Sequence, residues 1–222
     1  MCGRYTLESD MEFLQQRFKF AISDLDYKPR YNIAPTQDVL TVTNNGERHA
    51  QFMRWGLTPF WAKDLKIGSR MINAKAETLA EKSSFRNAFK KRRCLVLADG
   101  FYEWRKDGTE KIPTYIFQKS CEPFAFAGLW ETWRSPEDEV IRSCTIVTTE
   151  PNSFIEPIHN RMPVMVSEEA EALWLDPLTE DPAVLKQLLV PFPPELMDSY
   201  PVSTLVNSPR SQGKENIEPV AG

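Results

Sequence analysis

The sequence has no apolar run long enough to cross a membrane, and its first residues lack the basic-then-apolar pattern of a secretory signal peptide. Cysteine is scarce: the four cysteines are widely spaced, with no C-x-x-C pair. These absences argue against a disulfide-stapled secreted domain and against a zinc site. We therefore expect a cytoplasmic protein without a metal or cofactor, in which Cys94 and Cys144 are buried thiols and Cys121 lies in a turn.

An excess of positive charge is also missing. The net charge is -4, so the chain as a whole does not have the electrostatics of a nucleic-acid-binding protein, and any contact with DNA must rest on a local basic patch. With 41% hydrophobic and 26% charged residues, the composition is that of a globular domain. We expect one domain over 1–222, in which the polar stretch 211–222 is either a loose tail or an edge segment.

Helices are indicated near the start of the chain and in its last third. A helix over 9–19 is predicted because Met11, Leu14 and Phe18 fall on one face, and because Ser9 and Glu12 have capping-box spacing. Later helices are expected after capping residues, over 85–91 (Ser83 or Ser84), 168–175 (Ser167) and 183–189 (Asp181-Pro182).

Strands are indicated by runs rich in β-branched and aromatic residues, at 39–42, 93–98, 114–117, 124–129, 144–148 and 163–166. Hairpin turns are expected at Asn44-Asn45-Gly46 and Lys106-Asp107-Gly108, whereas the segment 29–35 is expected to be irregular. Short strands joined by hairpins, with helices at intervals, predict an α+β fold: a single domain built on a mostly antiparallel β-sheet or partial barrel with flanking helices.

The second residue is a cysteine, and its position gives it unusual chemistry. If Met1 is removed, Cys2 carries an α-amine and a thiol on adjacent carbons. The amine can attack an aldehyde to form a Schiff base, and the sulfur can then close a five-membered thiazolidine ring. Ordinary pKa values of about 8 for the amine and about 8.5 for the thiol leave some of each group reactive near neutral pH. The alternative is a chance cysteine with an ordinary thiol.

Three further motifs place a polar residue in apolar or constrained surroundings. Asn73 lies among apolar and small residues, where its amide is either a shielded donor and acceptor or a helix cap. Glu103 lies among aromatic residues in the motif 99–104; it is either a buried carboxyl group with a raised pKa or an exposed hairpin residue. His159, between two prolines, either shuttles protons near neutral pH or satisfies a loop carbonyl.

A fourth motif favours binding. Residues 55–61 gather Trp55, Phe60 and Trp61 with Gly and Pro, which suits a shaped loop whose rings can stack on unpaired bases; the alternative for Trp55 is a place in the core. Candidate phosphate contacts are Arg4, Arg54, Lys75 and Arg161. The basic run 90–93 is either a phosphate patch or a solvated helix end.

Together these segments resemble one family, the SOS response-associated peptidase (SRAP) family of abasic-site processing proteins. The resemblance runs in order through nearly the whole chain. Its six motifs are Cys2-Gly3-Arg4-Tyr5, Tyr31-Asn32-Ile33-Ala34-Pro35, Trp55-Gly56-Leu57, Ile72-Asn73-Ala74-Lys75-Ala76-Glu77-Thr78, Asp99-Gly100-Phe101-Tyr102-Glu103-Trp104 and Ile158-His159-Asn160-Arg161-Met162-Pro163. Val202-Ser203 with Val206-Asn207 fits the family's C-terminal signature.

The resemblance implies the SRAP fold and a DNA-damage response protein that cross-links itself to abasic sites in single-stranded DNA. It implies Cys2 as the nucleophile, Asn73 and His159 as residues that line the site, and Glu103 as the residue that handles protons, including reversal of the cross-link. Positions expected to contact DNA are Gly3, Arg4, Pro35, Phe60, Trp61, Lys75 and Arg161. Lys75 departs from the pattern, because some members have arginine there and lysine loses the two-point contact.

The chemistry of the lesion agrees with this expectation. An abasic sugar exists partly as an open-chain aldehyde, which an aminothiol captures well, whereas loss of a C2′ proton would instead expel the 3′ phosphate in a lyase reaction. A partner strand would cover the lesion in a duplex, so the expected partner is single-stranded DNA or a junction with duplex, not a membrane. We expect a monomer that associates with the nucleoid when it is bound to DNA.

Two other functions remain open from the sequence. A cysteine-type peptidase would use Cys2, His159 and Glu103 as nucleophile, base and orienting group, and in its limited form it would remove only Met1. A non-covalent single-strand binding module would stack bases without a covalent step, and its binding would be sensitive to salt.

Overall fold

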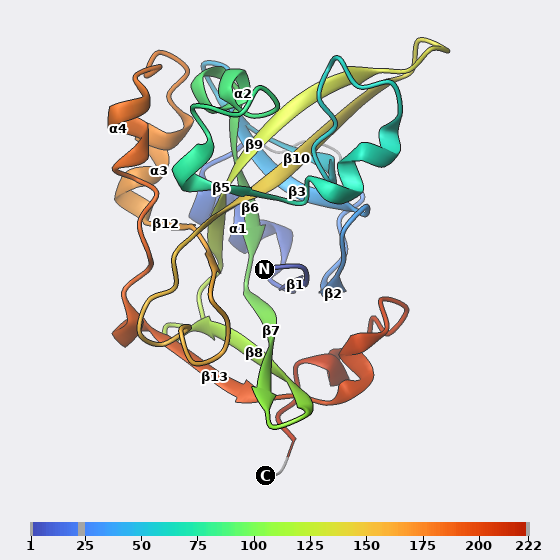
Figure 1. The fold of residues 1–222 in the computed structure, drawn as a ribbon, viewed down its shortest axis with the longest axis vertical. Helices are drawn as coiled ribbons and strands as arrows, with labels where there is room; N and C mark the ends of the chain where they lie inside the picture. Colours follow the sequence, from blue (N-terminus) through green and yellow to red (C-terminus); the bar gives the residue numbers. More distant parts are fainter. Residues whose placement is uncertain (1, 22–24, 221–222) are drawn as a thin grey trace.

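A closed barrel lies at the centre of the molecule, of which the computed structural model describes residues 2–21 and 25–220. Around the ring its strands are β3 (Asp38–Asn44), β4 (Arg48–Trp55), β10 (Val140–Thr149), β9 (Phe124–Arg134) and β6 (Arg93–Ala98) (Figure 1). Neighbouring strands are antiparallel except β4 and β10, which are parallel. Closure leaves these strands no free edge. The predicted α+β fold on a mostly antiparallel sheet is confirmed, with a complete ring.

A second sheet extends from one end of the barrel, toward the lower part of Figure 1. Its order is β13 (Met197–Pro201), β8 (Glu110–Gln118), β7 (Gly100–Asp107), β1 (Tyr5–Leu7) and β2 (Arg30–Ile33). The chain passes from β6 into β7 at Asp99. The carboxylate of Asp99 accepts hydrogen bonds from the N–H groups of Glu8 and Ser9 and from the hydroxyl of Ser9. Asp99 therefore ties the N-terminal strand to the junction of the two sheets.

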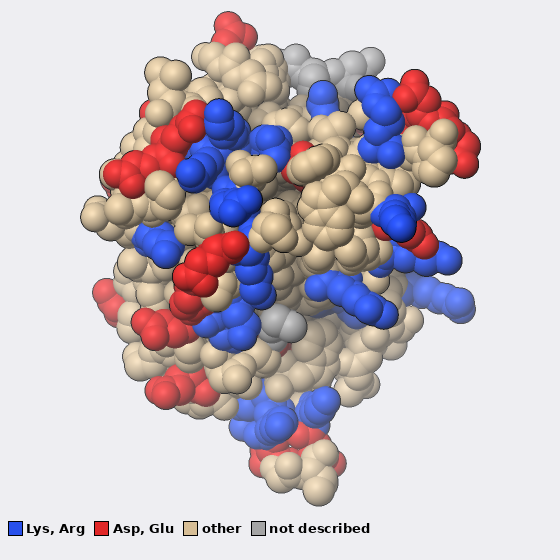
Figure 2. Space-filling view, turned by 45° about the horizontal axis from the view of Figure 1, so that its top comes forward, with Lys and Arg blue, Asp and Glu red and all other residues tan. Residues whose placement is uncertain are grey.

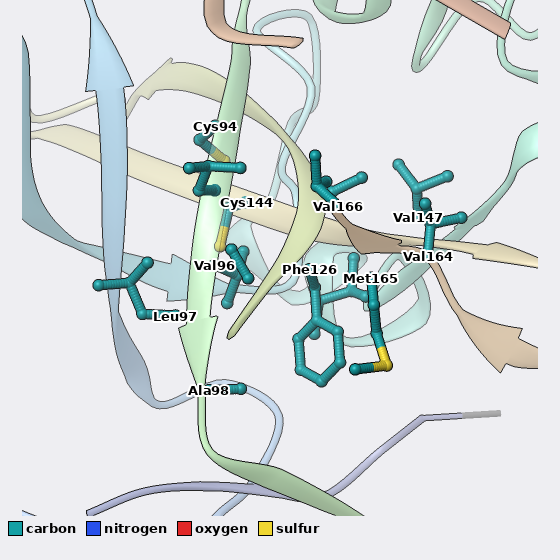
Figure 3. Close-up of a cluster of buried hydrophobic side chains, with 14 of the residues drawn as sticks. Cys94, Val96, Leu97, Ala98, Phe126, Cys144, Val147, Val164, Met165 and Val166 are labelled. Atoms are coloured by element: carbon teal, nitrogen blue, oxygen red, sulfur yellow. The ribbon is translucent and has the colours of Figure 1, made fainter. Parts of the chain in front are cut away.

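The core fills the barrel and the space between the sheets. Phe126 of β9 is fully buried and is paired with Val96 of β6 and with Met165 of β12 (Met165–Val166); Figure 3 shows the three side chains together. Its ring also makes edge contacts with Tyr5 and Phe101, at centroid distances of 5.7 and 6.0 Å. Removing such a ring costs about 3–5 kcal/mol of stability. The first strand is therefore fixed against the barrel.

The first two helices occur where they are predicted, but their caps differ. α1 (Met11–Phe18) is capped by Asp10, whose carboxylate accepts from the N–H of Phe13 at 2.8 Å. The predicted capping box at Ser9 is wrong, because the hydroxyl of Ser9 is bonded to Asp99. α2 (Arg86–Lys91) has no side-chain cap, so the predicted cap at Ser83 or Ser84 is also wrong.

The later helices follow the prediction more closely. α3 (Glu168–Leu175) begins after Ser167 with the predicted bounds, although the serine hydroxyl makes no capping bond to the backbone. α4 (Pro182–Lys186) is shorter than predicted and is capped by Asp181. Short 3-10 segments are η1 (Leu65–Arg70), η2 (Ala76–Thr78), η3 (Pro194–Leu196), η4 (Thr204–Asn207) and η5 (Lys214–Asn216). None of the helices within 2–21 and 25–220 has the length and apolarity needed to span a membrane.

All six predicted strand runs lie in strands, and both predicted hairpin turns are present. The run 163–166 is divided between β11 (Met162–Pro163) and β12. The prediction of an irregular segment at 29–35 is wrong: β2 lies within it and pairs with β1, and the prolines are confined to its ends, where they remove no ladder hydrogen bond. Cys94 and Cys144 are buried and Cys121 is exposed with a φ of 57°, as predicted.

The C-terminal segment packs against the five-stranded sheet. Val202, Val206 and Ile217 form a small buried cluster with Tyr102 and Tyr115. Val202 also forms a β-bridge with Pro219. Residues 211–220 thus contact the domain, and residues 221 and 222 lie outside the described residues.

Candidate active site

The N-terminal residues run antiparallel to β7. Tyr5 is paired with Phe101, and the N–H of Tyr102 donates to the carbonyl of Arg4 at 2.9 Å. The same register, carried two residues further, puts Gly3 opposite Glu103. Cys2 lies at the end of this segment and is completely buried. The motifs 2–5 and 99–104, far apart in the sequence, therefore meet.

Asn73 reaches Cys2 from the barrel. It begins β5 (Asn73–Lys75), which lies parallel to β10, with Asn73 opposite Ile146. The side-chain Nδ2 of Asn73 donates to the carbonyl oxygen of Cys2 at 2.9 Å. Just before it, the carbonyl of Ile72 accepts from the indole N–H of Trp55 at 2.9 Å. Asn73 therefore holds the backbone of Cys2, and Trp55 is a fully buried core residue.

His159 approaches from the other side of β10. β11 pairs with one edge of β10 through Thr148 and Pro163, while β5 pairs with the other edge, and the segments meet past the end of the strand, where Arg161 contacts Glu77. The Nδ1 of His159 accepts a hydrogen bond from the N–H of Arg161 at 3.0 Å. The same Nδ1 lies 3.2 Å from the carbonyl oxygen of Arg161, so the short loop before β11 holds this side of the ring and leaves Nε2 to face the site.

Arg161 is held by two partners beside the same strand. Its guanidinium forms a two-point ion pair with Glu77, at 2.6 and 3.0 Å, and donates to the carbonyl of Thr148 at 2.7 Å. The hydrogen bonds from Arg161 lower the pKa of Glu77, so this carboxylate is charged at neutral pH. β10 is thus the element that brings the motifs 72–78 and 158–163 side by side.

Burial controls the protonation of the three titratable side chains. Glu103 is only 3% exposed, so the alternative of an exposed hairpin residue is wrong; burial raises its pKa to about 7, where it can both accept and donate a proton. Burial lowers the pKa of His159 and favours the neutral ring. Burial raises the pKa of the Cys2 thiol, and the nearby carboxylate of Glu103 raises it further. The sulfur is therefore protonated until a base removes its proton.

A buried asparagine positions Arg4 next to this site. The Nη1 of Arg4 donates to the Oδ1 of Asn32 at 2.7 Å and to the carbonyl of Val206, and the guanidinium lies 5.9 Å from the ring centre of Trp104. The Nδ2 of Asn32 in turn donates to the carbonyls of Ser208 and Ser211, at 3.0 and 2.7 Å. The sequence motif 31–35 contains Asn32, but the sequence gives no sign of these partners, which lie 174 to 179 positions away.

The aromatic loop after β4 presents two exposed rings. Phe60 and Trp61 are 62% and 49% exposed. The loop is anchored below them, because the carbonyl of Ala62 accepts from the indole N–H of Trp133 at 2.7 Å. At Gly56, φ is +127° and a Cβ would lie 2.6 Å from the carbonyl oxygen of Gly68, so only glycine fits. The two rings are therefore held in place on a constrained loop.

The remaining predicted contact residues surround these elements. Lys75 is exposed on β5, two residues after Asn73, while Gly3 and Pro35 are half-buried. Arg54 donates to the carbonyl of Thr36, next to Pro35, at 2.8 Å. The run 90–93 is used structurally: Arg93 is buried and donates to backbone carbonyls, including that of Trp174 at 2.6 Å.

Three site residues have a buried polar atom without a hydrogen-bond partner in the described part of the chain: the Nε of Arg4, the Oδ1 of Asn73 and the Nε of Arg161. Leaving such an atom unpaired costs about 1–3 kcal/mol. A polar ligand in the site would supply partners. Figure 2 shows Lys and Arg side chains gathered over the centre of one face, so a locally basic surface exists despite the net charge of -4.

Comparison with known proteins agrees with these motifs. The model of the SOS response associated peptidase (SRAP) family matches residues 1–209. This chain belongs to the SRAP family. It is 48% identical over 222 residues to the abasic site processing protein YoqW of Bacillus subtilis, covering 98% of this chain and 99% of that protein. It is 30% identical over 227 residues to the abasic site processing protein YedK of Escherichia coli, covering 99% and 100%.

Two further matches extend over most of the chain, one to a sequence and one to a solved structure. The abasic site processing protein HMCES of Gallus gallus is 32% identical over 227 residues, covering 87% of this chain and 67% of that protein. A crystal structure of a protein from Bacteroides thetaiotaomicron superposes with a TM-score of 0.91 at 28% identity, covering 99% of this chain and 100% of that one. In this SRAP chain, residues 2–21 and 25–220 contain no group of three or more His, Cys, Asp or Glu side chains arranged to hold a metal ion.

Proposed function

We propose that this SRAP protein recognises abasic sites in single-stranded DNA and forms a covalent thiazolidine cross-link through Cys2 after Met1 is removed. The observation that carries the proposal is the convergence on Cys2: its carbonyl is held by Asn73, and the carboxyl group of Glu103, with a pKa of about 7, lies near its sulfur. The names of the relatives, abasic site processing proteins, support the same lesion as the target.

The reaction balances without an added reactant. The α-amine of Cys2 attacks C1′ of the open-chain sugar, and the resulting carbinolamine loses one water to give an iminium ion. The sulfur then adds to C1′, forming the C–S bond, while the thiol proton passes to a base and the electron pair of the C=N bond returns to nitrogen. The net products are one thiazolidine and one water.

The protonation states of the site suit this order. Because burial keeps the thiol protonated, the amine reacts first and the sulfur adds once its proton is taken. Glu103 is the candidate for that base, and its protonated form is the candidate donor to the departing water. The neutral His159 has its Nδ1 bonded to the backbone, which leaves proton transfer to Nε2. The same groups, run in reverse, open the ring and release the cross-link.

The surroundings of Cys2 suit a single strand. A partner strand would cover the lesion, whereas an unpaired strand can turn its sugar toward Cys2. The exposed rings of Phe60 and Trp61 offer surfaces on which bases can stack, and Lys75 offers a charge for a phosphate. Among residues 2–21 and 25–220, the buried Nε atoms of Arg4 and Arg161 and the Oδ1 of Asn73 have no hydrogen-bond partner, and they are candidate contacts to the sugar and its phosphates.

A second activity is removal of Met1 by the chain itself. The proximity of Glu103 to Cys2 favours it, because a carboxyl group with a pKa of about 7 can assist cleavage of the bond before Cys2. Mass spectrometry of the purified Glu103→Gln protein tests it. Retained Met1 supports self-removal, and complete removal in this variant assigns the step to a separate aminopeptidase.

The cross-link is tested by incubating the protein with a single-stranded oligonucleotide that contains one abasic site and running a denaturing gel. Wild type is expected to give a heat-stable adduct and Cys2→Ala none. Cys121→Ala is the matched control, because Cys121 is an exposed thiol whose loss should leave the adduct unchanged. An adduct of equal yield with Cys2→Ala would contradict the proposal. Binding that disappears entirely under denaturing conditions would identify a non-covalent single-strand binding module instead.

A further inference from the structure

A cleft of about 490 Å³ opens beside Glu103 and His159, on the side of the site that faces the second sheet. Its other lining residues are Trp104, Lys106, Lys111 and Asn207. None of these four belongs to the predicted site, and we call this space the hairpin cleft, because the two lysines lie on the β7–β8 hairpin. It adjoins the reacting groups directly, since Glu103 and His159 form one of its walls.

The two lysines form an unusual pair. Lys106 and Lys111 are directly opposite each other in the antiparallel register, so their side chains extend from the same face of the hairpin. Both are exposed, and neither forms an ion pair with another residue of 2–21 or 25–220. Like charges directly opposite each other destabilise a two-stranded ribbon. A polyanion lying across the hairpin would remove this repulsion.

Neighbouring charges do not neutralise the pair. Asp107 forms an ion pair with Arg105 at 3.7 Å, and Glu110 lies opposite Asp107 at the tip of the hairpin. Burial is the main cause of the lowered pKa of His159, and the ammonium group of Lys106 lowers it further, so the positive charge reaches a residue that lines the cleft. In Figure 2, basic and acidic side chains lie together on the part of the molecule that projects at the lower end.

Trp104 and Asn207, which line the cleft, are held together by a hydrogen bond. The indole N–H of Trp104 donates to the Oδ1 of Asn207 at 2.7 Å, and Arg4 lies 5.9 Å from the centre of the same indole ring. Asn207 belongs to η4, whose Val206 carbonyl also accepts from Arg4. A strand passing through the cleft would therefore meet a fixed aromatic wall with ammonium groups on the outer side.

We propose that the hairpin cleft binds the DNA backbone on one side of the abasic residue, with Lys106 and Lys111 contacting phosphates, while the aromatic loop receives the strand on the other side. This deepens the proposed function and rests on it for the position of the lesion. Glu103 lines the cleft and acts on Cys2, whose carbonyl is bonded to Asn73 of β5, the strand that also carries Lys75. The cleft and the barrel residues therefore lie on different sides of Cys2. A continuous strand whose abasic residue lies at Cys2 and Glu103 would therefore contact the aromatic loop on one side of the lesion and the hairpin cleft on the other.

The test compares Lys106→Gln/Lys111→Gln with wild type and with Lys28→Gln/Lys186→Gln. This control removes the same charge from two exposed positions outside the hairpin, Lys28 before β2 and Lys186 in α4. The probe is a fluorescent single strand with a tetrahydrofuran lesion, which has no aldehyde, so binding is measured even if no cross-link forms. Three probes carry flanking nucleotides on both sides, on the 5′ side only, or on the 3′ side only.

Wild type and the control should bind more tightly when nucleotides are added on either side. The Lys106→Gln/Lys111→Gln variant should bind roughly tenfold more weakly, and flanking nucleotides should no longer tighten binding on one side of the lesion. The slope of log affinity against log salt concentration should be smaller by about 1.4, as expected for the loss of two phosphate contacts on a single strand. Affinity and salt slope equal to wild type would overturn the proposal. An equal loss on both sides, or the same loss in the control, would overturn it too, because it would indicate only a diffuse charge effect. Failure of the cross-link assay with normal binding here would reject the proposed function alone.

Discussion

The amide nitrogen of Asn73 and the carbonyl oxygen of Cys2 are joined by a hydrogen bond of 2.9 Å that links the start of the chain to the barrel. The bond orients the backbone of Cys2, and therefore its amine and sulfur, relative to the groups around it. The other amide atom, the Oδ1 of Asn73, is buried and lacks a partner among the described residues. The side chain thus holds the backbone of Cys2 with one atom and, in the proposed reaction, offers the other to the sugar.

Replacing Asn73 should therefore slow the cross-link more than it affects folding. Asn73→Ala removes the donor and is expected to lower the initial rate of adduct formation roughly tenfold, in line with the loss of one hydrogen bond of about 1–1.5 kcal/mol. Asn73→Asp should be slower still, because it puts a carboxylate against the carbonyl of Cys2. Single-turnover rates on denaturing gels measure both variants, and an Asn73→Asp rate equal to that of wild type would contradict the role.

Glu103 should make the protein less stable as the pH rises. Its folded-state pKa of about 7 lies above the ordinary value of 4.5, so between these pH values the folded protein keeps a proton that the unfolded chain releases. The free energy of unfolding should therefore fall by roughly 3 kcal/mol as the pH rises from 4.5 toward 7. Glu103→Gln cannot ionise, so it should be more stable than wild type at pH 8 and similar to it at pH 4.5. Urea unfolding at the two pH values measures this difference, and a difference that does not change with pH would rule out a buried, titrating Glu103.

The ion pair between Arg161 and Glu77 should compete with DNA for the same guanidinium. The side chain of Glu77 is 52% exposed, so a phosphate can reach the pair. Glu77→Gln removes the competing charge, while the carbonyl of Thr148 still positions Arg161. We expect roughly threefold tighter binding of single-stranded DNA at low salt. Fluorescence anisotropy measures it; weaker binding would mean that Glu77 instead prepares Arg161 for its ligand.

The aromatic loop should contribute affinity without contributing stability. Trp61→Ala, at a position 49% exposed, is expected to weaken binding of single-stranded DNA roughly tenfold, because stacking one base on an aromatic ring is worth about 1–3 kcal/mol. Val140→Ala, at a position 50% exposed on a barrel strand, is the matched control. The melting temperature should stay within a few degrees of wild type in both proteins. Unchanged affinity in Trp61→Ala would remove this loop from the interface.

Local signals in the sequence were sufficient for most of the fold but not for its closure. β6 has the predicted bounds, 93–98, because a continuous apolar run between a basic segment and Asp99 marks a buried strand. β2 was missed because its prolines suggested a loop, and its pairing with β1 joins residues 23 and 28 positions apart. The parallel contact of β4 with β10, which closes the ring, leaves no local pattern in either strand.

For the candidate site, too, the residues can be recognised from the sequence, whereas their arrangement in space cannot. The chemical character of Cys2, Asn73, Glu103 and His159 is readable from the sequence, but their convergence depends on the pairing of β10 with β5 on one side and with β11 on the other. Asn32 and the hairpin cleft were missed, because the roles proposed for them rest on contacts with the C-terminal segment around Val206 and Asn207. No periodicity or spacing within the chain reports such contacts.

In the proposed reaction, Cys2 captures the sugar with both its α-amine nitrogen and its sulfur. The most direct measurement is mass spectrometry of the N-terminal peptide released by protease and nuclease digestion of the adduct, without borohydride reduction. We expect a peptide that begins at Cys2, carries the sugar with the loss of one water, and has no thiol that iodoacetamide can alkylate. A peptide that retains Met1, an alkylatable Cys2 thiol in the adduct, or a sugar attached to a lysine would contradict it.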